Sequence, residues 1–366
     1  MELGIDVSSY LEVLDAKGKF FRDGKEIDPL DEFVKNNVKQ MRIRLWNNPY
    51  SEHGDKYLGG TCDLSNLLKL AKLSQKKGFS IYLDIHYSDF WADPAKQFKP
   101  KAWRDLHGED LLNAVYEFTK STLQTIKENG IDLKMIQVGN EITNGFLWPD
   151  GKLIDNQDGP RSNYEFFSSL LKQGFKACEV LFPNALKMIH LEKSYDKTIY
   201  KEFFENMEKY GVKYDVIGAS YYPYWHGTTE QLFDNLNYCK NRFKKKIVIA
   251  ELAYAFTMDD YLKDSDHGNN LAINKESFPN ELPFPITKDG QAAFLSDFLD
   301  KAERNEVYQV YYWEPLWVPG KLTCWASESG QEYINEKKKS TRNEWANQCL
   351  VDYEGNLNPS FDKYKI

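Results

Sequence analysis

The chain has 366 residues, 42% of them hydrophobic, and its 47 basic and 55 acidic residues give a formal net charge of -8. This length and composition suffice for a large buried core and exclude a disordered chain. The acidic balance argues against nucleic acid or an anionic membrane as a partner, because both require a basic surface.

Apolar, β-branched or aromatic runs of strand length recur along the chain and are separated by amphipathic segments. The predicted strands are Leu3–Val7, Gln40–Trp46, Phe79–His86, Lys134–Gly139, Leu186–Leu191, Asp215–Tyr221, Lys246–Ala250 and Val307–Trp313. The predicted helices are Asp28–Asn37, Asp63–Lys77, Glu109–Asn129, Ser162–Phe182, Lys197–Tyr210, Thr229–Lys244 and Thr287–Asn305.

The alternation of eight strands with helices predicts a single (β/α)8 TIM barrel domain over residues 1–366, since no Pro-, Ser- or Gly-rich linker divides the chain. An open doubly wound sheet is the alternative, but no GxGxxG motif follows the first strand. A small hairpin around Asp23-Gly24 is expected in the first connection. The longest connections follow strands four, seven and eight, at Ile142–Arg161, Leu252–Ile286 and Glu314–Asn356. Loops after barrel strands lie on the C-terminal face, where active sites are built.

Two of the predicted strands run into glutamate. Strand four is followed by Asn140-Glu141 and strand seven by Glu251, and the neighbouring strand ends carry Arg, His, Tyr and Trp side chains. Strands four and seven lie across the mouth of an eight-stranded barrel from each other. We therefore expect the two carboxyl groups to converge over it.

Two converging carboxyl groups are what the hydrolysis of a glycosidic bond requires. With retention, the groups lie about 5–5.5 Å apart, one protonated to assist the leaving oxygen and one ionised to attack the anomeric carbon. Repulsion between like charges separates their pKa values. Asn140 is expected to hydrogen-bond a sugar hydroxyl, while Arg44 and Tyr222 are expected to keep Glu251 ionised. Aromatic side chains offer flat apolar faces to sugar rings.

Several other side chains have two open explanations. His190 ends strand five and is either a satisfied histidine of the barrel rim or part of the cleft. Trp148, Trp225 and Trp317 are either sugar platforms or core residues, whereas Trp103 is expected to pack, as is Trp345. Cys178 and Cys239 lie in apolar helical patterns and are expected to be buried thiols, while a pair between Cys324 and Cys349 stays open.

The strand ends also form long motifs. These stretches resemble glycoside hydrolase family 53, the endo-β-1,4-galactanases, within a larger clan of retaining barrels that carry both glutamates on strands four and seven. The matching stretches are Gly4–Ser8, Arg42–Pro49, His86–Pro94, Gln137–Pro149, Ser220–Trp225 and Tyr312–Pro319. The motifs HYSDFWADP and VGNEITNGFLWP are the most specific, and the resemblance covers nearly the whole chain.

The resemblance implies roles for individual residues. It makes Glu141 the acid/base and Glu251 the nucleophile, with Arg44 supporting the nucleophile. The residues that would line the sugar-binding cleft are His86, Asp89, Trp91, Asn140, Tyr222 and Trp313. The expected activity is endo-acting cleavage of β-1,4-galactosidic bonds in galactan or type I arabinogalactan, the side chains of pectin. Tryptophans spread over several strand ends agree with an open groove.

The loop after strand seven carries an oxygen-rich cluster at 264–270. Similar bacterial galactanases hold Ca²⁺ in this loop through a spaced Asp, Asp, His and Asn. The candidate ligands here are Asp264, Asp266, His267 and Asn269. Because His267 follows Asp266 directly, the spacing departs from that pattern, and a solvated turn is the alternative. No cofactor is expected for the chemistry itself, so Ca²⁺ would be structural.

Two other functions are alternatives to a galactanase. A non-catalytic carbohydrate-binding barrel would keep the aromatic plates and lose one carboxylate, and a related barrel could act on mannan or xylan. The presence of both glutamates favours an enzyme, and only the long motifs select galactan. We expect a monomer whose partner is the polysaccharide, with no membrane insertion. The sequence shows no signal peptide, and Met1-Glu2 runs straight into an apolar strand-like segment. We therefore expect the mature part of an exported protein that is secreted, periplasmic or on the cell surface.

Overall fold

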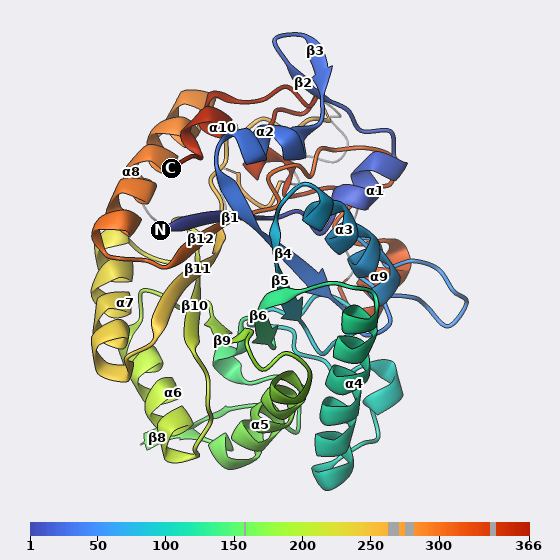
Figure 1. The fold of residues 1–366 in the computed structure, drawn as a ribbon, viewed down its shortest axis with the longest axis vertical. Helices are drawn as coiled ribbons and strands as arrows, with labels where there is room; N and C mark the ends of the chain where they lie inside the picture. The colour runs from blue at the N-terminus through green and yellow to red at the C-terminus, as the bar shows by residue number, and fades with distance from the viewer. Residues whose placement is uncertain (157–158, 263–270, 275–281, 337–341) are drawn as a thin grey trace.

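Eight parallel strands close into a barrel in the computed structural model of the chain, which describes residues 1–156, 159–262, 271–274, 282–336 and 342–366 (Figure 1). The strands are β1 (Glu2–Asp6), β4 (Val38–Leu45), β5 (Ser80–Ile85), β6 (Leu133–Val138), β9 (Leu186–Leu191), β10 (Val216–Tyr221), β11 (Lys246–Leu252) and β12 (Gln309–Trp313). Their order around the barrel is β1-β12-β11-β10-β9-β6-β5-β4, and β1 closes the ring by pairing with both β12 and β4. The predicted (β/α)8 barrel is confirmed.

Helices cover the outside of the barrel (Figure 1). The predicted helices are all present as α2 (Pro29–Lys35), α3 (Leu64–Lys76), α4 (Gly108–Glu128), α5 (Tyr164–Leu181), α6 (Lys197–Lys209), α7 (Thr229–Phe243) and α8 (Lys288–Arg304). Several begin at a polar cap. At α7, for example, the Thr228 side chain accepts from the backbone N–H of Gln231, whose own side chain returns to the Thr228 backbone. Such reciprocal caps satisfy the free N–H groups of a first helical turn.

Short elements decorate the connections. The predicted hairpin is formed by β2 (Phe20–Arg22) and β3 (Lys25–Ile27), and positive φ angles at Asp23 and Gly24 give the turn that a two-residue hairpin needs. The elements that periodicity did not predict are α1 (Tyr10–Asp15), α9 (Glu328–Tyr333), α10 (Pro359–Lys363), β7 (Ile154–Asn156), β8 (Gly159–Ser162) and the 3-10 turns η1 (Lys101–Trp103), η2 (Ile142–Asn144) and η3 (Ala346–Gln348). Each is too short to show a helical or strand period.

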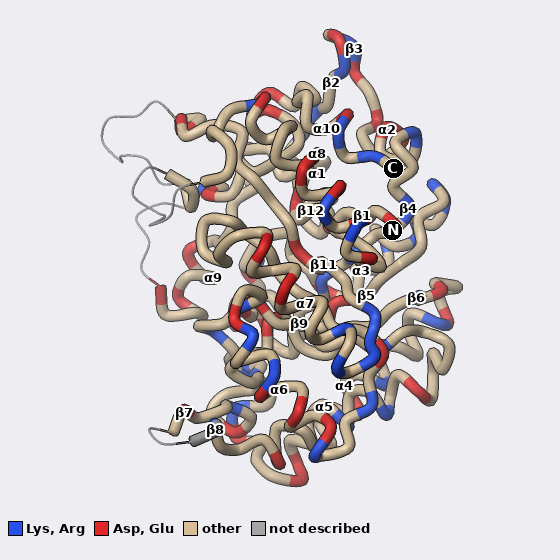
Figure 2. Tube along the Cα trace, turned by 90° about the vertical axis from the view of Figure 1, so that its left-hand side faces the viewer, with Lys and Arg blue, Asp and Glu red and all other residues tan. Residues whose placement is uncertain are grey.

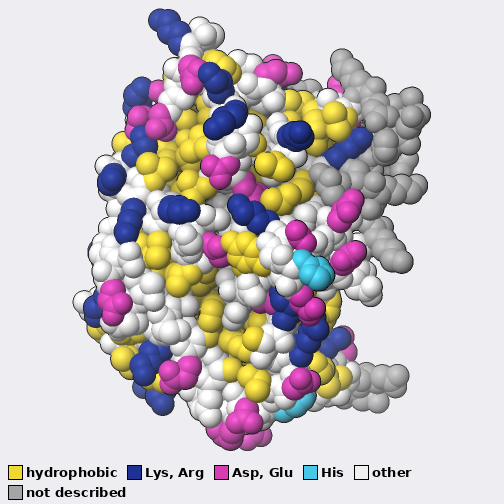
Figure 3. Space-filling view, turned by 90° about the vertical axis from the view of Figure 1, so that its right-hand side faces the viewer, with side chains coloured by type: hydrophobic (Ala, Val, Ile, Leu, Met, Phe, Trp, Pro, Cys, Tyr) yellow, Lys and Arg dark blue, Asp and Glu magenta, His cyan; other side chains and the backbone are white. Residues whose placement is uncertain are grey.

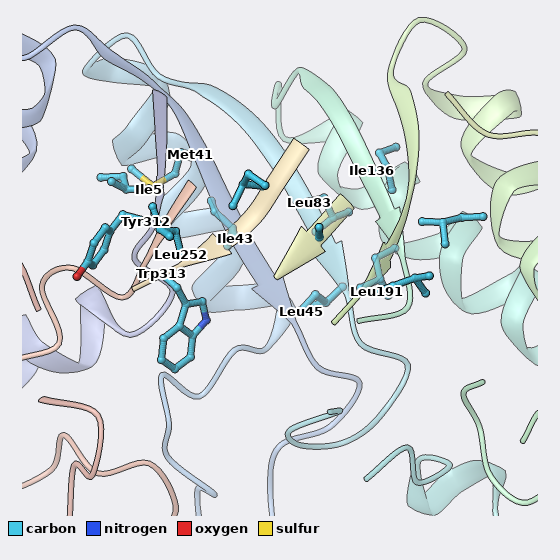
Figure 4. Packing of buried hydrophobic residues seen from close by; sticks show 14 of the residues in the cluster. Ile5, Met41, Ile43, Leu45, Leu83, Ile136, Leu191, Leu252, Tyr312 and Trp313 are labelled. Carbon is cyan, nitrogen blue, oxygen red and sulfur yellow. The ribbon is translucent and has the colours of Figure 1, made fainter. Parts of the chain in front are cut away.

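Barrel strands are apolar on both faces, as expected when helices cover a parallel sheet. A small cluster inside the barrel consists of Tyr82, Met135, Met188, Val216, Val248, Ala250 and Tyr311. The next residue along the strand points the other way, so Leu83 and Ile136 belong to the larger cluster between strands and helices (Figure 4). Strands β5, β6, β9, β10, β11 and β12 therefore each contribute to two separate apolar layers.

Charged residues of both signs are interspersed along the chain trace (Figure 2). On the face drawn in Figure 3, Lys and Arg side chains stand singly or in small groups among acidic, polar and apolar ones. Of the helices within the described residues, none combines the length and the apolar content that crossing a membrane would take.

All five cysteines are buried, unpaired thiols. Cys178 and Cys239 pack in α5 and α7, as predicted from their apolar surroundings. Cys324 and Cys349 lie in the same long connection after β12 but are not joined to each other. The structure therefore shows no disulfide between Cys324 and Cys349.

Candidate active site

The polar layer of the barrel follows from the alternation of side chains along each strand. Residues two apart face the same side of a strand. The inward positions of β5 therefore run from Tyr82 to Asp84, and those of β9 from Met188 to His190. Inward-facing side chains are thus apolar in the middle of these strands and polar at their C-terminal ends. The alternation of side chains along each strand therefore places polar groups at the mouth of the barrel.

Glu141 and Glu251 meet at this mouth. One carboxylate oxygen of each residue and one ring nitrogen of His190 lie within 4.8 Å of one another. The two glutamates are only 8% and 6% exposed. Glu141 adopts a left-handed backbone conformation, with φ 47° and ψ 51°. Residues other than glycine rarely do so, and such strain concentrates at functional sites.

This trio is also the one group of metal-ligand type that the described ranges contain. Its oxygen atoms already have protein donors: the Arg42 guanidinium lies 2.9 Å from Glu251 Oε1, and the Ser220 hydroxyl donates to Glu141 Oε1 at 2.5 Å. A fixed protein cation therefore stands beside Glu251.

Glu251 is held by two donors from neighbouring strands. Besides Arg42, the Tyr222 hydroxyl donates to Glu251 Oε2 at 2.8 Å. Arg42 is completely buried and also lies 2.8 Å from the carboxylates of Asp6 and Asp84, so its position is fixed from several sides. Burial raises the pKa of Glu251, and the Arg42 charge and the Tyr222 hydrogen bond oppose that rise.

Arg44, the arginine predicted to support the nucleophile, does not contact Glu251. Its Nη2 lies 2.7 Å from Glu314 Oε1, and its guanidinium stands 4.4 Å from the centre of the Trp91 ring. Both arginines of β4 face the barrel interior because they are two residues apart, and the deeper one, Arg42, extends to Glu251. The prediction is corrected from Arg44 to Arg42, although Arg44 does line the cleft.

Glu141 has no cationic partner among the described residues. Ser220 donates to it, and the same hydroxyl oxygen lies 2.9 Å from His190 Nε2. Burial raises the pKa of Glu141 well above its usual value, and the negative charges of Glu251 and Glu192 raise it further. Glu251 therefore gives up its proton first, and Glu141 keeps one.

The pair opens onto a cleft of about 370 Å³, a size usual for small-molecule sites. Predicted site residues in its wall are Arg44, His86, Trp91, Asn140, Glu141, Tyr222, Glu251 and Trp313. Residues that the sequence did not single out for it include Glu192, His226, Trp325, Glu336, Glu344 and Trp345. A larger hollow of about 1060 Å³ lies between the loops after β11 and β12, but neither glutamate reaches it. The chemistry therefore belongs to the smaller cleft.

Asn140 and His86 are fixed in the cleft wall by polar contacts. Asn140 Oδ1 accepts from Arg42 Nη2 at 2.9 Å, and its Nδ2 donates to the backbone oxygen of Ala92 at 2.9 Å. His86 Nε2 lies 2.9 Å from Asp84 Oδ2. These two side chains are thus oriented before any ligand arrives.

Asp89, predicted in the cleft, is not among the residues that line it. Its Oδ1 accepts from the backbone N–H of Asn48 at 3.0 Å, and its Oδ2 accepts from the backbone N–H of Lys101 at 2.7 Å. The Lys101 ammonium adds an ion pair at 2.9 Å. Both oxygens of this carboxylate therefore bind groups in the loops after β4 and β5, and they link the two loops.

The structure decides between the two explanations for the tryptophans that the sequence left open, and it corrects the expectation for Trp345. Trp225 lines the cleft and is 37% exposed, as a platform would be, while Trp345 lines it too, although it was expected only to pack. Trp317 is fully buried and so cannot present a face to a ligand, and Trp148 lies outside the cleft wall. Trp103 packs against Phe118, as predicted.

Arg42, Ser220 and Glu192 are the principal residues that sequence reasoning missed. A usable signal existed for each, because all three occupy inward positions: Arg42 lies two before Arg44, Ser220 two before Tyr222, and Glu192 two after His190. The proposed Ca²⁺ ligands Asp264, Asp266, His267 and Asn269 lie outside the described residues.

Comparison with known proteins agrees with this geometry. The endo-beta-1,4-galactanase of Bacillus subtilis (strain 168) is 32% identical over 99% of this chain and 85% of its own length. The arabinogalactan endo-beta-1,4-galactanase A of Aspergillus niger is 32% identical over 86% of this chain and 85% of its own. A solved structure, the GH53 catalytic domain of Ignisphaera aggregans, superposes with a TM-score of 0.86 at 35% identity and covers 99% of this chain and 94% of that one. The family model described as glycosyl hydrolase family 53 matches residues 2–364, and the chain therefore belongs to this family of glycoside hydrolases.

Proposed function

We propose that this enzyme hydrolyses β-1,4-galactosidic bonds by double displacement, with Glu251 as the nucleophile and Glu141 as the acid/base. The observation that carries this assignment is the asymmetry between two buried carboxyl groups. Glu251 faces the Arg42 cation and the Tyr222 hydroxyl, whereas Glu141 faces other carboxylates. One group is thereby kept ionised and the other protonated.

In the first step the Glu251 carboxylate attacks the anomeric carbon while Glu141 gives its proton to the glycosidic oxygen. The bond to the leaving sugar breaks, and a glycosyl ester forms on Glu251. In the second step Glu141, now ionised, takes a proton from water, whose oxygen attacks the same carbon and releases Glu251. Glu141 ends protonated again, so that each proton is accounted for.

The spacing of the pair supports retention of configuration. Oxygen atoms of Glu141 and Glu251 lie within 4.8 Å of each other. An inverting enzyme must place a water between its carboxyl groups, which then stand about 6.5–9.5 Å apart, whereas a retaining enzyme needs about 5–5.5 Å. The closeness of the two carboxylate oxygens supports the spacing of a retaining pair.

The substrate follows from the relatives rather than from the geometry. The Bacillus subtilis and Aspergillus niger proteins are named for β-1,4-galactan and arabinogalactan, so type I arabinogalactan is the proposed substrate here. A polysaccharide such as arabinogalactan does not cross a cell membrane by itself. This supports action in a secreted, periplasmic or cell-surface location.

Aromatic side chains in different parts of the cleft wall support endo action. Trp91 follows β5, Trp225 follows β10, Trp313 ends β12, and Trp345 lies farther along the connection after β12. Plates contributed by separate strand ends can hold sugars on both sides of the bond that is cut. A chain could then be bound at its middle.

Incubation with β-1,4-galactan, mannan and xylan tests this proposal. We expect rapid loss of viscosity on galactan alone, with mixed oligosaccharides appearing before much reducing sugar. Cleavage of mannan or xylan instead would overturn the substrate. Release of single sugars from the start, with viscosity unchanged, would overturn endo action.

A further inference from the structure

Glu192 is a third carboxylate in the wall of the catalytic cleft. It directly follows β9, is 4% exposed, and lines the same cleft as Glu141 and Tyr222. Its Oε2 accepts a hydrogen bond from the hydroxyl of Thr143, in the η2 turn that begins after Glu141. Its Oε1 is buried and has no hydrogen-bond donor within the part of the protein that the structure describes.

An unsatisfied buried carboxylate oxygen is costly, because desolvation of a charged group is not repaid by a hydrogen bond. Lys193 and Arg161 are the cations whose charges act on Glu192, but within the described residues neither donates a hydrogen bond to its carboxylate. The Arg161 side chain is engaged elsewhere. Its Nε donates to Glu202 Oε1 at 3.0 Å, and its Nη1 donates to the backbone oxygen of Thr143 at 2.5 Å. One oxygen of a carboxylate in the cleft wall is thus left without a donor from the described residues.

The position of Glu192 identifies which sugar would supply that donor. Glu141 gives its proton to the leaving oxygen, so the departing sugar must lie on the Glu141 side of the cut bond. Glu192 directly follows β9, which pairs with β6, the strand that precedes Glu141, and its charge acts on Glu141. Trp225, which follows β10 next to β9, offers an exposed aromatic face in the same wall.

We infer that Glu192 binds a hydroxyl group of the sugar on the leaving-group side, and that with Trp225 it forms the subsite for the departing chain. This inference rests on the proposed function, in which Glu141 is the acid. It makes Glu192 a determinant of which sugars can leave. Because transfer is the reverse of departure, it also determines which sugars can act as acceptors for the glycosyl-enzyme.

The test compares two kinds of substrate on Glu192→Ala and Glu192→Gln. A galacto-oligosaccharide places a sugar against Glu192, whereas a nitrophenyl galacto-oligosaccharide places a leaving group there that has no hydroxyl. We expect Glu192→Ala to lower kcat/KM on the oligosaccharide about 10- to 100-fold, the usual effect of a lost hydrogen bond to a charged group. Glu192→Gln, which keeps an acceptor oxygen, should lose less. The loss of kcat/KM on the nitrophenyl substrate should be much smaller than the loss on the oligosaccharide, and an unchanged melting temperature reports correct folding.

A second readout separates binding from tuning of the acid. With the nitrophenyl substrate and added galactobiose, the share of transfer product over hydrolysis should fall in both variants. Glu165→Gln, on the exposed side of α5, is the matched control and should change neither ratio. Equal losses on both substrates, or an unchanged share of transfer product, would overturn the inference. A wild-type enzyme inactive on both substrates would instead overturn the proposed function itself.

Discussion

The hydroxyl of Tyr222 donates a 2.8 Å hydrogen bond to Oε2 of Glu251, on the side of the carboxylate opposite Arg42. Together these contacts fix both oxygens of the nucleophile. They also lower its pKa against the rise that burial causes. The pH at which the enzyme becomes active should therefore depend on Tyr222.

Tyr222→Phe removes this hydrogen bond and leaves the ring in place. Because the hydrogen bond favours the ionised form, its loss raises the pKa of Glu251, and the acidic limb of kcat/KM should move to higher pH. The plateau should fall about 10- to 100-fold. Tyr221→Phe is the control, since that hydroxyl donates to the backbone of Gly227 and not to the cleft. An unmoved acidic limb in Tyr222→Phe would show that Arg42 alone sets the charge of Glu251.

The two glutamates should respond differently to truncation. Glu141→Ala should still cleave substrates with a good leaving group, which need little protonation, whereas Glu251→Ala should lose activity on every substrate because no glycosyl ester can form. Azide should partly restore Glu141→Ala and give a β-azide product. If the β-azide product instead came from Glu251→Ala, and Glu141→Ala gave an α-azide, the two roles would have to be exchanged.

The barrel was predictable because its information is local. Alternating apolar strands and capped amphipathic helices recur along the chain, and every predicted strand end falls within two residues of the observed one. The partner of Glu251 was not predictable in this way. Arg42 and Arg44 share the same inward parity, and only the packing inside the closed barrel decides which of them extends to Glu251.

Residues on the long connections were predicted least well. Trp317 and Trp345 both follow β12, yet the first is buried and the second lines the cleft. No period distinguishes them, since irregular loops carry none. The sequence is equally ambiguous at Asp89. A polar residue just beyond a strand end can bind loop backbone groups, as Asp89 does, as readily as it can bind a ligand.

Glu12 should make stability fall as pH rises. Its buried carboxyl accepts from the Gly60 backbone at 2.8 Å and from the Thr61 hydroxyl, and burial raises its pKa from 4.5 to about 7 in spite of these bonds. The folded state thus binds more protons than the unfolded chain between these values, so the free energy of unfolding decreases through that window. Urea denaturation measures the free energy of unfolding at each pH. Between about pH 5 and pH 8 this free energy should decrease by about 2–3 kcal/mol less in Glu12→Gln than in the wild type. The exposed control Glu52→Gln should match the wild type. If the free energy of unfolding of Glu12→Gln changed with pH as steeply as that of the wild type, the raised pKa of Glu12 would be contradicted.

The sequence around Asp264 and Asp266 predicts a structural Ca²⁺ site in the connection after β11. Removal of Ca²⁺ with EDTA should lower the melting temperature, and excess Ca²⁺ should restore it, because an ion that binds only the folded state stabilises it. Unchanged melting, together with a metal analysis that finds no calcium, would leave this segment as a solvated turn.

The stereochemistry of the first product tests the account most directly, because it reports the covalent step on Glu251. Proton NMR can follow the new reducing end of a β-1,4-galacto-oligosaccharide during the first turnovers, before the anomers equilibrate. Double displacement on this pair of glutamates predicts that the β-anomer appears first and the α-anomer only later, by mutarotation. Initial formation of the α-anomer would contradict the account, because it would mean that water attacks directly.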